Sequence, residues 1–158
     1  MKKTRIAIVG LGMAVTPHAK GLMDLKDTVE VVHAFSPSAE RRTAFGARFP
    51  FPLADSLDTV LTDARVEAVA VFTPANTHCE IAEKCAAAGK HVLMEKPLDI
   101  TTARAERLVA ACHDAGVVLG VVLQHRFRPA GVRLRQILAS GALGKVVGCS
   151  TTIRLWRP

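Results

Sequence analysis

Residues 5–12 constrain the fold of this chain more than any other segment. They read Arg-Ile-Ala-Ile-Val-Gly-Leu-Gly, so four consecutive apolar residues run directly into two glycines one residue apart. A short, wholly apolar run predicts a strand that is buried on both faces, as in a parallel sheet. Thr16 and Pro17 follow as a candidate helix N-cap and first helical residue. The chain is therefore predicted to begin with a strand, a glycine turn and a helix.

The two glycines predict a turn that binds phosphate. Gly10 lets the chain turn sharply, and Gly12 lets the backbone approach a pyrophosphate closely. The free N–H groups and the positive end of the following helix would then face the anion. Val15 stands where the G-x-G-x-x-G pattern has its third glycine, and we expect it to push the helix from the strand and weaken pyrophosphate binding. By itself such an incomplete pattern is weak evidence for a dinucleotide site.

Apolar runs alternate with helical patterns along most of the chain. The run 117–123 is apolar except for Gly120, so we predict a central strand. Ser36 is the expected N-cap of a helix beginning at Pro37, and Thr77-His-Cys-Glu80 has the pattern of a capping box. The alternation predicts an α/β fold, a Rossmann-type doubly wound parallel sheet. The other expected strands are 29–35, 68–72 and 91–94, and the other expected helices are 20–25, 56–62 and 101–115.

The last segments differ in pattern from those before them. Residues 129–140 carry an amphipathic helical pattern, and residues 146–156 alternate between apolar and polar side chains. Such alternation is typical of a half-exposed strand, unlike the buried strands that precede it. We therefore expect only the first helix and strand of a second α/β domain. That strand would pair with another chain, fold back or be poorly ordered.

Composition restricts the partners of this chain. The net charge of +7 is compatible with a solvated basic surface or with an anionic ligand. Aromatic residues make up only 4% of the chain, too few for platforms that stack nucleic-acid bases, so no nucleic-acid partner is expected. No apolar run approaches the ~18 residues that cross a membrane, so no membrane partner is expected either.

The cysteines show neither a C-x-x-C pattern nor the Cys/His spacing of a metal site. We expect no bound metal and interpret them as small buried apolar residues in a reducing compartment. The apolar run after Met1 is short, broken by glycine and needed for the first strand, so it does not predict a secretion signal. A cytoplasmic protein is expected. The cysteines are Cys79, Cys85, Cys112 and Cys149.

Five motifs, in their order and spacing, resemble those of one enzyme family. The set is similar to the Gfo/Idh/MocA (glucose–fructose oxidoreductase / inositol dehydrogenase) family of NAD(P)-dependent oxidoreductases, over nearly the whole chain. The resemblance implies an enzyme that transfers hydride to or from a small-molecule substrate, a sugar, polyol or related hydroxyl or carbonyl compound. The motifs are Gly10-Leu-Gly12, Thr73-Pro-Ala-Asn-Thr-His78, Gly89-Lys-His-Val-Leu-Met-Glu95-Lys96-Pro97-Leu98, Gln124-His-Arg-Phe-Arg-Pro129 and Ser140-Gly-Ala-Leu-Gly-Lys145.

The same resemblance implies a domain organisation. Residues 1–127 would form the NAD(P)-binding Rossmann domain, and residues 128–158 the opening segment of a truncated C-terminal domain. In the family that second domain carries the substrate pocket and much of the oligomer interface. We therefore expect a homo-oligomer for the full-length protein and no turnover by residues 1–158 alone. A non-catalytic dinucleotide-binding or redox-sensing module remains an alternative.

The family's motifs also imply individual site residues. Lys96 is the expected catalytic residue, close to the nicotinamide and the reacting carbon, and His125 and Arg126 would contact the substrate or form a basic hinge. His78 would contact the cofactor, or else be a plain helix-surface histidine. Glu95 would contact the cofactor ribose or pair with a nearby base. The other implied cofactor contacts are Gly10, Leu11, Gly12, Met13, Ala14, Ser36, Arg41, Thr73, Pro74 and Asn76.

Ser36 bears on the choice between NAD and NADP. Folds of this type that select NAD normally hold the ribose with a carboxylate about 20 residues beyond the glycines. Here the second strand ends in Phe-Ser-Pro, without an acid. Ser36 is expected to donate to a 2′-phosphate, with Arg41 or Arg42 supplying positive charge. NADP is therefore slightly favoured over NAD, and an N-cap role for Ser36 is compatible with this.

Overall fold

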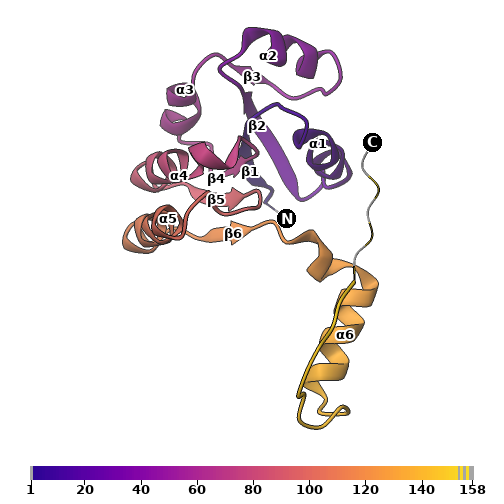
Figure 1. Ribbon diagram of the computed structural model, residues 1–158. Helices are drawn as coiled ribbons and strands as arrows, with labels where there is room; N and C mark the ends of the chain where they lie inside the picture. The colour runs from indigo at the N-terminus through magenta and orange to yellow at the C-terminus, as the bar shows by residue number, and fades with distance from the viewer. Residues whose placement is uncertain (1, 153, 155, 157–158) are drawn as a thin grey trace. The chain divides into compact units, whose positions relative to one another are not determined.

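The computed structural model describes residues 2–152, 154 and 156, which divide into a first unit, Met1–Val122, and a second, Leu123–Pro158. The described residues of the first unit form six parallel strands in the order β3-β2-β1-β4-β5-β6 (Figure 1). This is the strand order of the doubly wound Rossmann fold, which confirms the predicted fold class. The strands are β1 (Thr4–Val9), β2 (Val29–Phe35), β3 (Leu53–Ala54), β4 (Ala68–Val71), β5 (His91–Met94) and β6 (Leu119–Val121).

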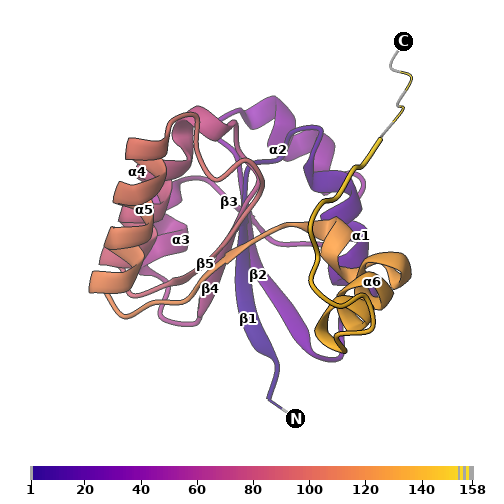
Figure 2. The same ribbon diagram turned by 60° about the horizontal axis from the view of Figure 1, so that its bottom comes forward.

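The helices of the first unit cover both faces of the sheet. Figure 2 shows α1 (Val15–Asp24) and α2 (Ala39–Gly46) on one face. On the other face lie α3 (Leu57–Thr62), α4 (His78–Ala87) and α5 (Thr102–Asp114), with a short 3₁₀ turn, η1 (Ala75–Thr77), before α4. None of the helices among the described residues has the length and apolar character that crossing a membrane requires.

The strands β1, β2 and β4 contribute alternate side chains to two separate cores. In β1, Ala7 and Val9 pack toward α3, α4 and α5, whereas Ile6 and Ile8 pack toward α1 and α2. Both faces of these strands are therefore buried, which is why they are mostly apolar.

Three of the four cysteines are small core residues, as predicted. Cys79, Cys85 and Cys112 are buried and unpaired, and burial raises the pKa of the Cys85 thiol to about 12. A thiol with so high a pKa carries almost no thiolate near neutral pH and is a poor nucleophile. Cys149, in the second unit, is exposed, so the prediction of burial is wrong for this residue.

The carboxyl ends of the strands lie level with one another. Val9 is in register with Phe35 of β2 on one side and with Val71 of β4 on the other. Val71 in turn pairs with Met94 of β5, which pairs with Val121 of β6. The residues that follow each of these positions therefore emerge at one edge of the sheet, on either side of β1, where the strand order reverses. Ligands of open α/β sheets bind at this edge.

Two helices begin differently from the sequence prediction. The N-cap of α2 is Ser38, whose side chain accepts a hydrogen bond from the Arg41 amide, so Ser36 does not cap this helix. Thr77 does precede α4, but its side chain makes no capping bond. Instead the carboxylate of Asp99 accepts from the Cys79 amide at 2.9 Å. The cap of α4 is thus a tertiary contact that a local capping-box pattern cannot reveal.

The first helix and the last strand also differ from expectation. Helix α1 begins at Val15 after Ala14, so Thr16 is not its N-cap. Val15 is buried beside Ala19 in the core between the sheet and the first two helices. Strand β6 pairs only with β5 among the described residues and lies at the edge of the sheet, so the prediction of a central strand is wrong. An apolar composition alone does not separate an edge strand from a central one.

The second unit contains η2 (Gln124–Phe127) and α6 (Pro129–Ala139), and the helix predicted from residue 129 is confirmed. The apolar side chains of Val132, Leu134 and Leu138 on α6 are exposed. No strand forms at the described positions of 146–156, namely 146–152, 154 and 156, so the strand predicted there is not formed over these residues. Positions 153 and 155 lie outside the described residues. A half-exposed strand needs a neighbouring strand to pair with, and none lies beside it in this unit.

Gly10 permits the closest approach between two parts of the backbone at the sheet edge. Its φ is +101°, a conformation that L-residues rarely adopt, and its N–H donates to the Phe35 carbonyl at 2.9 Å. A Cβ at this position would lie 2.6 Å from the Phe72 carbonyl carbon and 2.6 Å from the Thr73 nitrogen. Backbone atoms on both sides cannot yield as a flexible side chain would, so this position requires glycine.

Gly10→Ala is expected to lower the free energy of unfolding by about 2–4 kcal/mol, because the new methyl group meets backbone atoms at a positive φ. Gly21→Ala is the matched control, since a Cβ there meets nothing within 4 Å in the body of α1. This control should raise stability by about 0.5–1 kcal/mol. Urea unfolding followed by circular dichroism measures both changes. A Gly10→Ala variant as stable as the parent chain would contradict the structure.

Candidate functional site

A cavity of about 520 Å³ lies at the carboxyl edge of the sheet. Its walls come from the glycine turn after β1, the end of β2, the turn after β4, and single residues of α2, α3 and α4. The cavity therefore spans the point where the strand order reverses, as the register of the strands requires. Its lining residues are Val9, Gly10, Leu11, Gly12, Met13, Ala14, Phe35, Ser36, Pro37, Arg41, Leu57, Phe72, Thr73, Pro74, Thr77 and Ile81.

The glycine turn leaves room for an anion beside the start of α1. A Cβ built on Gly12 would meet only the Arg41 guanidinium, at 4.0 Å, so the space above this residue is open. Ala14 occupies the N-cap position of α1 and provides no side chain to bind the first N–H groups of the helix. An uncapped helix start with an open approach suits phosphate oxygens, which accept hydrogen bonds from backbone N–H groups.

Arg41 is the one charged residue among those that line the cavity. The next residue of α2, Arg42, does not line the cavity, and its guanidinium donates a hydrogen bond to the Ser36 carbonyl at 2.6 Å. Ser36 itself is almost fully buried, and its Oγ accepts from the Ser38 amide at 3.4 Å. No carboxylate of the described residues lines this cavity. The cavity therefore favours an anionic ligand over a cationic one.

The turn after β4 is held by hydrogen bonds within itself. Thr77 Oγ1 lies 2.7 Å from the Pro74 carbonyl oxygen and 2.8 Å from Thr73 Oγ1. The Thr77 amide also donates to the Pro74 carbonyl, at 2.9 Å. These contacts turn the Thr73 and Thr77 hydroxyl groups toward each other at the cavity wall.

Lys96 follows β5 at the same edge of the sheet and is exposed. The peptide bond to Pro97 is cis. The carboxylate of Glu95 accepts a hydrogen bond from the Lys96 amide at 2.6 Å, and its other oxygen lies 3.5 Å from His18 Nε2. The His18 ring stacks on Phe72, with centroids 4.1 Å apart. Glu95 is thus held between α1 and the backbone of Lys96, the pairing with a nearby base that was one of its two expected roles.

His78, the first residue of α4, is buried and faces backbone carbonyl groups. Its Nε2 lies 2.9 Å from the Thr73 oxygen, and its Nδ1 lies 3.1 Å from the Pro97 oxygen and 3.2 Å from the Leu98 oxygen. It is neither a helix-surface residue nor part of the cavity lining.

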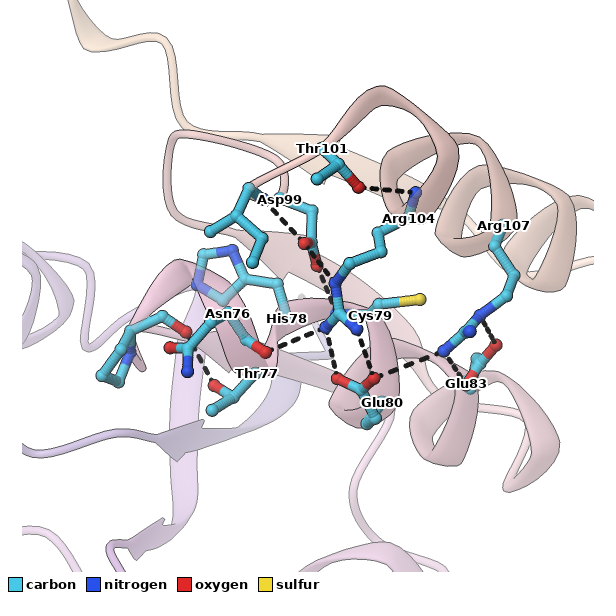
Figure 3. Close-up of polar contacts among 12 residues, drawn as sticks. Asn76, Thr77, His78, Cys79, Glu80, Glu83, Asp99, Thr101, Arg104 and Arg107 are labelled. Carbon is cyan, nitrogen blue, oxygen red and sulfur yellow. Dashed lines mark hydrogen bonds and ion pairs between the residues drawn. The ribbon is translucent and has the colours of Figure 1, made fainter.

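A network of acids and arginines fixes the start of α4 beside this site (Figure 3). Arg104 of α5 donates to Asp99 at 2.7 Å, to Glu80 at 2.6 Å, and to the Asn76 carbonyl at 2.9 Å. Hydrogen bonding from Arg104 lowers the pKa of the Glu80 carboxyl to about 2. Burial opposes ionisation of Asp99, yet hydrogen bonds from Arg104 and from the amides of residues 79 and 100 keep its pKa below the ordinary value. The network anchors the segment between β4 and α4.

Nine of the thirteen residues predicted to contact the cofactor line the cavity, and the other four do not. Asn76, His78, Glu95 and Lys96 do not line the cavity. His125 and Arg126 lie in η2, within the second unit. The sequence reasoning missed several cavity residues because apolar and turn residues in these positions look like ordinary core or loop. The predicted residues that line the cavity are Gly10, Leu11, Gly12, Met13, Ala14, Ser36, Arg41, Thr73 and Pro74, and the missed ones are Val9, Phe35, Pro37, Leu57, Phe72, Thr77 and Ile81.

Comparison with known proteins agrees with this geometry. The model of the oxidoreductase family with an NAD-binding Rossmann fold matches residues 4–123. The chain is 32% identical over 146 residues to myo-inositol 2-dehydrogenase of Thermotoga maritima. It is 27% identical over 157 residues to the scyllo-inositol 2-dehydrogenase (NADP(+)) IolW of Bacillus subtilis. These alignments cover 89% and 98% of this chain, respectively, but 42% of each relative.

A solved structure shows the same likeness. The WlbA dehydrogenase from Bordetella pertussis, in complex with NADH and UDP-GlcNAcA, matches this chain with a TM-score of 0.84 and 29% identity. The match covers 90% of this chain and 44% of that one. The chain thus spans less than half the length of these similar proteins.

Asp99→Asn tests the network that anchors α4. The variant keeps an oxygen that accepts from the Cys79 amide but removes the charge that faces Arg104. We expect the free energy of unfolding to fall by about 1–3 kcal/mol at neutral pH. Asp114→Asn is the control, because its carboxylate is exposed at the end of α5. Urea unfolding of both variants measures the difference, and equal stability of the Asp99 variant and the parent would contradict the proposed anchoring.

The difference in stability between the Asp99→Asn variant and the parent chain depends on pH. A carboxyl group whose pKa is lowered in the folded state stabilises the fold above its unfolded-state pKa, and this contribution is lost as the pH falls through the folded value. For Glu80 the loss lies between about pH 5 and pH 2, and for Asp99 it begins as the pH falls below the ordinary pKa range of an aspartate carboxyl. The Asp99→Asn variant should therefore lose less stability than the parent over this range. Parallel curves for the two proteins would contradict this assignment.

Proposed function

Because the chain belongs to the oxidoreductase family with an NAD-binding Rossmann fold, we propose that it is the cofactor-binding part of an enzyme that transfers hydride to or from a sugar, polyol or related compound. One observation carries this proposal: the cavity at the strand reversal combines an open glycine turn, an uncapped helix start and a single cation. These are the features that bind the pyrophosphate of a dinucleotide. When bound, the nicotinamide ring accepts or donates the hydride.

The residues of the cavity fit the parts of such a cofactor. The open space over Gly12 receives the pyrophosphate. Apolar side chains of α3 and α4, Leu57 and Ile81, line the same cavity as Ser36 and Pro37 at the end of β2. An apolar wall beside the end of β2 suits the adenine ring and its ribose. Thr73 and Pro74 form the wall on the other side of β1, and Asn76 continues this turn toward α4.

Lys96 is the catalytic residue of this proposal. Its position after β5 and its exposure support a role at the substrate. The ammonium group hydrogen-bonds the substrate oxygen; when hydride is added to a carbonyl carbon, it stabilises the negative charge that develops on that oxygen and supplies the proton, and in the opposite direction the uncharged amine takes the hydroxyl proton as hydride leaves. The Glu95 carboxylate, bonded to the Lys96 amide, holds the backbone of this turn.

We assign the remaining roles to the second unit and to the complete protein. Residues 1–127 form the cofactor domain, and residues 128–158 open a second domain that takes part in substrate binding and in homo-oligomer formation. His125 and Arg126 contact the substrate. The exposed apolar face of α6 supports this division, because such a face needs a covering layer. The free, buried thiols support a reducing location, the cytoplasm.

NADP is the cofactor that this cavity fits better. The absence of a carboxylate from its described lining, together with Ser36 and Arg41 beside the end of β2, supports binding of a 2′-phosphate. Both cofactors occur among similar proteins, since IolW is named for NADP(+) and the WlbA structure contains NADH.

Fluorescence titration tests the proposed function. Addition of the chain to NADPH should enhance and blue-shift the nicotinamide fluorescence, with a Kd below about 1 mM. Gly12→Ala should weaken binding roughly tenfold, because its methyl group enters the space of the phosphate oxygens, while thermal stability stays unchanged. Gly21→Ala, within α1 and outside the lining of this cavity, is the control with unchanged affinity. Absence of NADPH and NADH binding by the parent chain would refute the proposal.

Cofactor preference is tested by Arg41→Gln. Loss of a charge-assisted hydrogen bond to a 2′-phosphate should raise the Kd for NADPH about tenfold and that for NADH less than about twofold. Lys84→Gln removes the same charge from an exposed position of α4 and should change neither Kd. An equal loss of affinity for both cofactors would place Arg41 at the pyrophosphate and contradict its role in selecting NADP.

A further inference from the structure

His78 lies between the two turns on which the proposed site depends. Its side chain is 1% exposed, and each ring nitrogen faces the backbone of a different turn. Nε2 lies 2.9 Å from the carbonyl oxygen of Thr73, at the cavity wall. Nδ1 lies 3.1 Å and 3.2 Å from the carbonyl oxygens of Pro97 and Leu98, in the turn that carries Lys96. All three oxygens are acceptors, so donation to both turns at once requires a hydrogen on each ring nitrogen, that is, the imidazolium form of the ring, whereas a neutral ring donates to one turn.

The two turns have few other polar links to each other. They follow neighbouring strands, because β4 pairs with β5 through Val71 and Met94. Beyond the strand ends, no side chain of the described residues other than His78 hydrogen-bonds to both the Thr73 turn and the Pro97–Leu98 segment. The Arg104 network adds a second link, through the Asn76 carbonyl and the Asp99 carboxylate, between α4 and α5 (Figure 3). Among the described residues, His78 is therefore the side chain that joins the Thr73 turn directly to the Pro97–Leu98 segment.

We propose that His78 is a positioning residue that holds the cavity wall through Nε2 and the Lys96 turn through Nδ1. It contacts neither the cofactor nor the substrate, which distinguishes it from a binding residue. The proposal rests on the proposed function, since it requires that the cavity binds a dinucleotide. A ring buried among carbonyl groups resists rotation, because any other orientation leaves buried oxygens without donors.

Two conservative substitutions each keep a donor toward one of the two turns and remove the donor toward the other. The side-chain nitrogen of asparagine is bonded to Cγ, as Nδ1 of histidine is, so His78→Asn keeps a donor toward Pro97 and Leu98. The side-chain nitrogen of glutamine lies one atom further out, near the place of Nε2, so His78→Gln keeps a donor toward Thr73. His78→Leu keeps an apolar body and removes both donors.

The readouts are the Kd for NADPH from fluorescence and the backbone amide signals of Lys96 and Leu98 from nuclear magnetic resonance of the free chain. His78→Gln should keep the Kd within about twofold of the parent and shift the two amide signals. His78→Asn should keep the amide signals and raise the Kd about five- to tenfold. His78→Leu should change both. His113→Asn is the control, because that side chain is exposed and contacts only Asp114.

The outcomes distinguish this inference from the function on which it rests. If the parent chain binds no NADPH, the proposed function fails. If the parent binds and the asparagine and glutamine variants change both readouts alike, His78 only fills space and the positioning role is overturned. The same conclusion holds if neither readout changes in the leucine variant. Circular dichroism of each variant establishes that α4 and the sheet are retained.

Discussion

The contact between Gly10 and the backbone after β4 is the constraint on which the site depends. Its hydrogen atom occupies space in which a Cβ would meet the Phe72 carbonyl carbon and the Thr73 nitrogen, each at 2.6 Å. The ends of β1 and β4 can therefore approach without a side chain between them. Because Val9, Val71 and Met94 are in register, the same approach brings the turns after β1, β4 and β5 to one edge. The cavity lies among the turns after β1 and β4 and the end of β2.

Charge is distributed so that the described lining of the cavity is free of acids. Asp99 and Glu80 both accept hydrogen bonds from Arg104 between α4 and α5, and Glu95 is held between His18 and the Lys96 amide. These three carboxylates are therefore engaged outside the cavity. Arg41 is then the one charged group among the lining residues, and it lies 4.0 Å from the Cβ position of Gly12. Because no acid opposes it there, a single cation is enough for the cavity to attract an anion.

Local sequence rules predicted elements better than they predicted contacts. Strand β2 was predicted with its observed bounds, since most of its residues are apolar and pack on both faces of the sheet. The start of α4 was located correctly, but its cap was assigned to Thr77 and Glu80. The cap comes from Asp99, about 20 residues away, and Glu80 is drawn to Arg104 instead. A capping-box pattern indicates which hydrogen bonds neighbouring residues are able to form. A charged partner on another helix decides which hydrogen bonds they do form.

The sequence by itself determined the strand–turn–helix alternation, the glycine turn and the order of the motifs, because each depends on short-range periodicity and backbone freedom. These suffice to predict a Rossmann sheet and a glycine turn after its first strand, which lines the cavity. Only the tertiary structure decided that β6 is an edge strand and that Ser36 leaves the capping of α2 to Ser38. It also decided that His78 is buried against three carbonyl oxygens. These outcomes depend on which segments meet across the sheet, and that is set by the packing of the whole unit.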